Sequence, residues 1–133
     1  MSEENVEFVR SLYEGSPSRF FELLDKDVEL ELSETFSVLP DHPDRIRGKD
    51  AVIDFCRHYW GTWDDYALEP TEIVDAGDDR VLAVYHERGR GKGSGVPFDR
   101  PVAVLLTVRA SKVAKLQYFS TREEALEAAG LSE

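Results

Sequence analysis

The strongest constraint on the fold lies in residues 93–130, GSGVPFDRPVAVLLTVRASKVAKLQYFSTREEALEAAG. This segment predicts two long strands, 96–110 and 112–119, joined by a tight polar turn and followed by a short helix. Within the first strand, both alternating faces of Val102–Val108 are apolar apart from Thr107. A strand of this kind must be covered on both faces. Helices can cover one face, and we find no helix left for the other. We therefore expect a homodimer formed through the outer face of the sheet.

The helices have recognisable start and stop signals. Thr121-Arg122-Glu123-Glu124 matches the capping box at a helix start, and Gly130 is typical of a helix end. Two helices are predicted to open the chain: the first ends at Gly15, and the second begins at Ser16-Pro17. The strongest helical pattern spans 48–63. Its apolar stripe comprises Val52, Phe55, Cys56, Tyr59, Trp60 and Trp63.

Period-two alternation adds further strands. Val28–Leu32 reads as a half-buried strand, and 66–74 and 80–90 read as two more. Residues 33–47 contain two prolines and predict a loop, with room for a short edge element. A loop of this length is often functional, so a flap over a pocket is one interpretation. Together these elements predict one α+β domain over residues 1–133.

Composition excludes several function classes. The net charge is −11 and the pI about 4.7, so most of the surface repels nucleic acid and anionic lipid. No apolar run approaches the roughly 20 residues that span a bilayer. The N-terminal residues lack the basic and apolar regions of a signal peptide, so we expect a cytoplasmic protein. Cys56 is the single cysteine, which excludes an intramolecular disulfide and favours a buried structural thiol.

The order of these segments resembles the SnoaL-like, polyketide cyclase-like branch of the nuclear transport factor 2 (NTF2-like) superfamily. The resemblance is carried by 4–15, 20–32, 47–60, 68–95 and 112–131, which together span nearly the whole chain. It implies an α+β cone: a curved mixed sheet wrapped around the long helix, with N-terminal helices and a short C-terminal helix. It also implies a conical cavity and a dimer through the outer sheet face. Members include isomerases, cyclases, epoxide hydrolases, dehydratases and domains without known chemistry, so the fold does not determine the function.

Ketosteroid isomerisation is the best-defined chemistry on this fold. It needs a carboxylate base, and a tyrosine and a protonated aspartate that together form an oxyanion hole. The resemblance puts these three groups near Leu32, Leu12 and Val104, all of which are apolar. If the isomerase pattern is shifted by one residue along this chain, Tyr13 or Glu31 falls at a functional position. Glu31, however, alternates with core-facing leucines and is expected to point outward. This activity is therefore not favoured.

Polyketide-cyclase members use an acid/base pair of the His and Asp type. The candidate here is His86, in the apolar strand pattern VLAVYHERG, together with a tyrosine such as Tyr118 or Tyr59. The alternative is a histidine with a structural or interface role. Side chains alternate between the two faces of a strand, but the residues from Val81 to Val84 are apolar on both faces. The alternation therefore does not decide whether Tyr85 or His86 faces the cavity.

Apolar and aromatic side chains on the inner face are the candidate pocket wall. They are Tyr13, Leu32, Phe55, Tyr59, Trp63, Val104 and Leu116. The alternative role for each of them is core packing. ERGRGKGSG (87–95) follows neither phosphate-loop pattern, and no cofactor or metal is predicted. We expect a domain that binds a hydrophobic small molecule. The alternative is a cofactor-free isomerase, cyclase or hydrolase-like enzyme that uses a pocket histidine and tyrosine.

Overall fold

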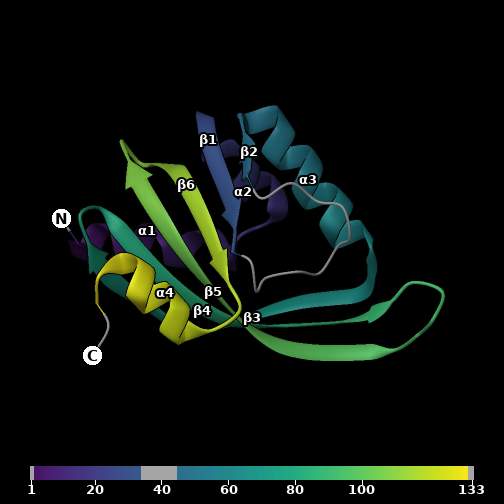
Figure 1. The fold of residues 1–133 in the computed structure, drawn as a ribbon. Coiled ribbons are helices and arrows are strands. Elements are labelled where there is room, and N and C mark those ends of the chain that lie inside the picture. Colours follow the sequence, from purple (N-terminus) through teal and green to yellow (C-terminus); the bar gives the residue numbers. More distant parts are fainter. Residues whose placement is uncertain (1, 34–44, 132–133) are drawn as a thin grey trace.

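The computed structural model describes residues 2–33 and 45–131 (Figure 1). The predicted flap therefore falls largely outside the described residues. The elements, in chain order, are α1 (Ser2–Glu14), α2 (Pro17–Glu22), β1 (Leu24–Leu32), β2 (Arg45–Arg47), α3 (Lys49–Gly61), β3 (Trp63–Gly77), β4 (Arg80–Gly91), β5 (Pro97–Arg109), β6 (Lys112–Phe119) and α4 (Arg122–Ala129).

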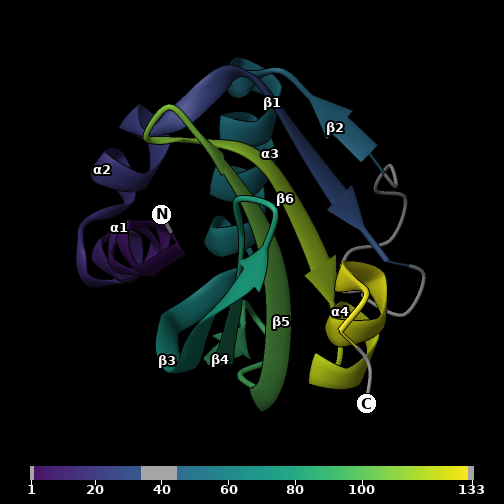
Figure 2. The same cartoon turned by 90° about the vertical axis from the view of Figure 1, so that its left-hand side faces the viewer.

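The six described strands form one curved, open sheet in the order β2-β1-β6-β5-β4-β3. β1 and β6 pair in parallel, and every other neighbouring pair is antiparallel. α1, α2 and α3 lie on the concave side of the sheet, and α4 lies on the opposite side (Figure 2). This is the α+β cone with a mixed sheet that the sequence predicted.

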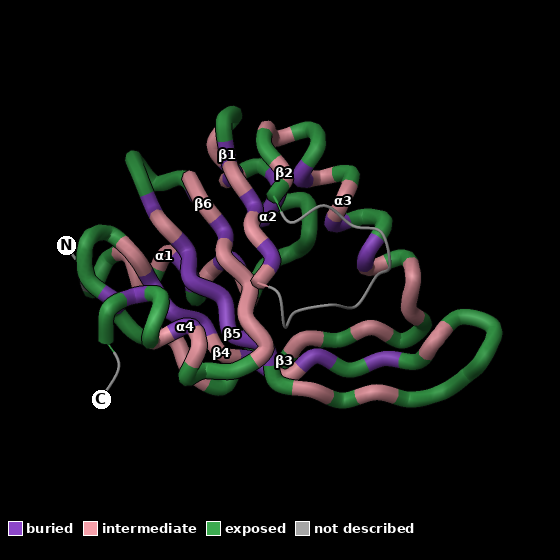
Figure 3. Tube along the Cα trace, viewed as in Figure 1, coloured by how far each residue is buried: buried purple, intermediate pink, exposed green. Residues whose placement is uncertain are grey.

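Alternation along β4 and β5 sorts their side chains between two cores. Val81, Ala83 and Tyr85 of β4 pack in the inner core, beneath the N-terminal helices and α3. Leu82 of β4 and Leu105 of β5 pack in a smaller outer core. Buried residues accordingly run without interruption along the middle of β5 (Figure 3). This strand is buried on both faces, as its sequence predicted.

The outer core corrects one prediction. α4 covers the outer face of the sheet, where Ala125 and Ala129 pack in the same cluster as Ala103 and Leu105. The expectation that the chain has no helix left for this face is therefore wrong. The two-sided strand is satisfied within one chain, and the homodimer stays a prediction.

The apolar pattern over 48–63 extends past α3, which ends at Gly61, a glycine where a helix breaks readily. Trp63 is already the first residue of β3. The ring of Trp63 packs against Phe98 of β5, with ring centroids 4.5 Å apart. The apolar stripe of the helix thus includes Tyr59 and Trp60 but not Trp63.

Candidate functional site

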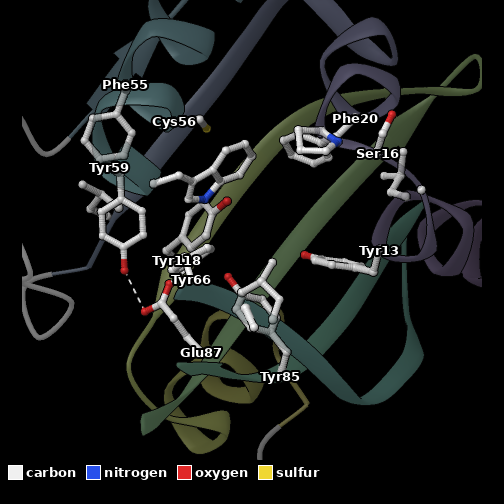
Figure 4. Close-up of a pocket in the computed structure, with 17 residues that line it drawn as sticks. Tyr13, Ser16, Phe20, Phe55, Cys56, Tyr59, Tyr66, Tyr85, Glu87 and Tyr118 are labelled. Atoms are coloured by element: carbon white, nitrogen blue, oxygen red, sulfur yellow. Dashed lines mark hydrogen bonds between the residues drawn. The ribbon is translucent and has the colours of Figure 1, made fainter. Parts of the chain in front are cut away.

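A cavity of about 360 Å³ lies between the three N-terminal helices and the concave face of the sheet (Figure 4). Its wall is mostly apolar and rich in aromatic rings. All five tyrosines of the chain line it: Tyr13, Tyr59, Tyr66, Tyr85 and Tyr118. Cavities of this size and lining typically hold small organic molecules.

Five different elements bring the polar groups of the wall together. α1 supplies Tyr13, α3 supplies Tyr59, β3 supplies Tyr66, and β6 supplies Tyr118. β4 supplies both Tyr85 and Glu87. These two face the same way because residues two apart on a strand share a face.

Glu87 is the one buried charged residue among those that the structure describes, and its exposed fraction is 1%. Its Oε1 accepts hydrogen bonds from the Tyr59 hydroxyl at 2.7 Å and from Arg100 Nε at 2.9 Å. Its Oε2 accepts a hydrogen bond from the Tyr66 hydroxyl at 2.5 Å. Arg100 Nη2 also donates to the Tyr59 oxygen at 3.2 Å. A carboxylate buried in an apolar wall requires this kind of pairing.

The phenols of the cavity stay protonated. Burial raises the pKa of Tyr13, Tyr85 and Tyr118 well above its ordinary value. Burial, followed by the charge of Glu87, likewise raises the pKa of Tyr59 and Tyr66. At neutral pH these groups are therefore protonated phenols that make hydrogen bonds, and they do not act as bases.

Cys56 of α3 lines the same cavity as a buried thiol. Burial raises the pKa of its thiol to about 12, so the thiol is neutral at physiological pH. This agrees with the structural role that the sequence favours for it.

The structure brings most of the predicted pocket residues to the cavity. Tyr13, Leu32, Phe55, Tyr59 and Tyr118 line it. Leu12 and Leu32, which occupy two of the positions of the isomerase pattern, line it as apolar groups.

Three of the predicted pocket residues do not line the cavity. Val104 and Leu116 are fully buried in the inner core and are not part of the cavity wall. Trp63 packs against Phe98 and meets Tyr59 edge-on instead. Their placement in the pocket wall is corrected to core packing.

The structure does not bring His86 to the cavity. Its side chain points to the outer face and is 45% exposed, and Nδ1 lies 2.8 Å from Asp99 Oδ1. Of these two neighbouring residues, Tyr85 therefore lies on the inner face of the strand and His86 on the outer face. His86 and Tyr118, the predicted catalytic pair, lie on opposite faces of the sheet, so they cannot act on one ligand in this cavity.

Sequence reasoning missed Tyr66 and Glu87, and it left Tyr85 as an open alternative to His86 for the residue that faces the cavity. The usable signal was the spacing of Tyr85 and Glu87, which places both on one face of the strand. Glu87 also lies directly opposite Arg100 in the β4–β5 register, but that pairing is visible only in the structure.

The described residues also bear on metal binding and on membrane insertion. In that part of the chain, no group of three or more His, Cys, Asp or Glu side chains is placed to hold a metal ion. None of its helices is long and apolar enough to cross a membrane.

Residues 6–116 match the model of the SnoaL-like domain. The chain belongs to the SnoaL-like family. No curated protein matches it in sequence.

Solved structures of similar fold agree with this assignment. A candidate SnoaL-like polyketide cyclase from Jannaschia sp. CCS1 superimposes with a TM-score of 0.74 at 18% identity, covering 99% of this chain and 94% of the other. A protein of ketosteroid isomerase-like fold from Catenulispora acidiphila, in complex with trimethylamine, gives 0.68 at 18% identity, covering 98% and 95%. TerC, co-crystallised with polyporic acid, gives 0.70 at 18% identity, covering 95% and 98%. At these identities, the similarity establishes the NTF2-like fold of this SnoaL-like domain.

Proposed function

We propose that this SnoaL-like domain binds a mostly apolar small molecule in the cavity between α1–α3 and the sheet. The observation that carries the proposal is the wall itself, about 360 Å³ of space lined by apolar groups and by every tyrosine of the chain. Aromatic rings supply contact area, and phenols fix the orientation of a ligand oxygen. The trimethylamine and polyporic acid complexes of the two similar folds support a screen of small organic molecules.

A blocked cavity tests the proposal. Ala67 lies at the exposed edge of the cavity wall, so Ala67→Trp adds bulk there without overpacking the core. Ala128→Trp on the exposed side of α4 is the matched control. We expect aromatic ligands found by thermal shift to bind the wild type and the control with saturation, and to bind Ala67→Trp at least tenfold more weakly. Equal affinity for all three proteins would place binding elsewhere.

A cofactor-free enzyme is the second candidate, and the observation that favours it is Glu87. A buried carboxylate in a mostly apolar cavity can take a proton from a carbon next to a carbonyl, while a phenol such as Tyr118 donates to the developing oxyanion. Glu87 therefore replaces His86 in the predicted pair. Deuterium exchange at the α-carbon of a bound ketone, followed by NMR, tests this role. Glu87→Gln is expected to abolish the exchange, and His86→Ala is expected to leave it unchanged. Exchange that survives Glu87→Gln would dismiss this candidate.

We also keep the homodimer as a proposal. What supports it is the outer sheet face at Val84, which packs against the outer core beneath α4 and is still only partly buried. Light scattering after size exclusion gives the mass directly. A dimer that becomes a monomer in Val84→Glu would support this surface, and a wild-type monomer at all concentrations would refute it. The cytoplasmic location stays a prediction.

A further inference from the structure

Glu87 divides the hydrogen-bonding groups of the cavity into two kinds. A tyrosine hydroxyl has one proton to donate, and a carboxylate can only accept. Tyr59 and Tyr66 both give their protons to Glu87. The guanidinium of Arg100 binds the same carboxylate and, having no lone pair, can only donate. Tyr59 and Tyr66 therefore present their remaining lone pairs to the cavity, not their protons.

The Tyr66 oxygen is the stronger acceptor of the two. Arg100 Nη2 already donates to the Tyr59 oxygen at 3.2 Å. No described residue donates to the Tyr66 oxygen. Burial and the adjacent Glu87 charge raise the pKa of Tyr66, so its proton stays committed to Glu87.

The wall formed by Tyr13 and Tyr85 has the opposite character. Their ring centroids lie 5.5 Å apart, and Figure 4 shows both phenols directed toward the middle of the cavity. Neither hydroxyl has a hydrogen-bond partner among the described residues, although Tyr85 is only 4% exposed. Both residues line the cavity, so their hydroxyls open onto it with a proton to donate, and an acceptor on a ligand would gain a hydrogen bond here.

We propose that the cavity orients its ligand by this polarity, receiving a ligand hydroxyl at the Tyr66 oxygen and a ligand carbonyl at the Tyr13 and Tyr85 hydroxyls. The ligand class is an aromatic or alicyclic hydroxyketone with its two oxygens at opposite ends of an apolar body. No Lys, Arg or His side chain lines the cavity in the described part of the chain, which disfavours an acid. This inference rests on the proposed function and adds the chemistry of the ligand to it.

Four naphthalenes of nearly equal size test the polarity without altering the protein. They are 6-acetyl-2-naphthol, 2-acetyl-6-methoxynaphthalene, 6-ethyl-2-naphthol and 2-ethyl-6-methoxynaphthalene. Calorimetric titration of the wild type is expected to rank the acetyl naphthol first. Replacing the hydroxyl with methoxy removes the donor of the ligand, and replacing the acetyl with ethyl removes its acceptor. Each replacement is expected to weaken binding about five- to tenfold, the value of one hydrogen bond.

Two tyrosine variants test the orientation. Tyr85→Phe removes a donor and is expected to erase most of the advantage of acetyl over ethyl, with the advantage of hydroxyl over methoxy unchanged. Tyr66→Phe uncovers Oε2 of Glu87, which is itself an acceptor, so the preference for hydroxyl over methoxy is expected to persist. If Tyr66 donated to the ligand instead, that variant would weaken the preference for acetyl over ethyl.

The outcomes separate this inference from the function on which it rests. Equal binding of all four compounds would overturn the polarity and leave a hydrophobic binding domain standing. A hydroxyl preference that disappears in Tyr85→Phe would also overturn it, because the ligand would then lie the other way round. Absence of saturable binding by all four would contradict both proposals. The wild-type ranking does not depend on any variant folding.

Discussion

At the scale of single residues, Glu87 shows how a charge is kept inside an apolar wall. Its two oxygens accept from two phenols and a guanidinium, and Arg100 offsets its charge from a position that is still partly exposed. Removal of one partner from such a cluster lowers the free energy of unfolding by more than the whole cluster contributes to it. The reason is that the remaining polar groups stay buried without partners.

The first prediction follows from this asymmetry. Glu87→Ala leaves the Tyr59 and Tyr66 hydroxyls and the Arg100 charge without their common acceptor, so we expect the free energy of unfolding to fall by about 3 kcal/mol. Glu69→Ala breaks an exposed ion pair with Arg88 and is expected to cost less than about 1 kcal/mol. Urea denaturation measures both changes. Equal losses in the two variants would show that the cluster around Glu87 adds nothing beyond a surface pair.

The second prediction concerns Cys56. With a thiol pKa of about 12 and little exposure, Cys56 has almost no thiolate at pH 8. We expect a disulfide reagent to label the native protein at least a hundredfold more slowly than the protein in guanidinium. Comparable rates in the two conditions would mean that the thiol is open to solvent.

The position of Glu87 explains why the site was predicted only in part. Tyr13, Phe55 and Tyr59 were found because helical spacing alone places them on the buried face. β4 carries apolar residues on both faces from Val81 to Val84, so alternation does not say which side of the next residues faces inward. The deciding facts are the register with β5 and the position of α4, and neither is encoded locally.

At the scale of elements, the sequence predicted the ends of α4 but not its position on the outer face of the sheet. Its start and stop were predicted: the Thr121 side chain accepts from the Glu124 backbone N–H, and Gly130 adopts φ 79°. Its role as the cover of the outer face was missed, because Ala125 and Ala129 are small and leave only a faint apolar stripe. Arg122 also ties the helix to Glu72 of β3 with two hydrogen bonds.

The third prediction tests this helix. Thr121→Ala removes the side-chain acceptor at the helix start, and we expect a loss of about 1 kcal/mol in unfolding free energy. Glu127→Ala in the exposed last turn removes a negative charge from the negative end of the helix, so it is not expected to destabilise. Thermal and urea denaturation compare the two variants. An unchanged stability in Thr121→Ala would mean that α4 needs no cap to stay docked.

At the scale of the whole molecule, element order was enough to predict the fold, because each helix and strand carried its own periodicity. β6 was predicted with the bounds that it has, and four other strands were found with shifted ends. One property still emerges only from the assembled chain. Folding gathers every tyrosine, and the single cysteine, around one cavity.

The fourth prediction follows from that gathering. The pKa of all five phenols and of the thiol is raised on folding, so the unfolded chain releases these protons at lower pH than the folded chain does. Their contribution to stability is complete below about pH 9 and is lost progressively as the pH rises above that. We expect the free energy of unfolding to drop steeply between about pH 9 and pH 11, and tyrosinate absorbance to appear together with unfolding. Tyrosinate that forms while the fold is intact would contradict the burial of these phenols.

The alternation in β4 also limits how this lineage can evolve. Tyr85 and Glu87 reach the cavity only because they are an even number of residues apart and paired in one register with β5. Insertion or deletion of a single residue before Tyr85 would turn the inward-facing residues of β4 toward solvent and its outward-facing residues toward the cavity. We therefore expect homologues to change ligand preference by substitution at the inward positions. Length changes should collect in the turns, and the outward positions His86 and Arg88 should drift.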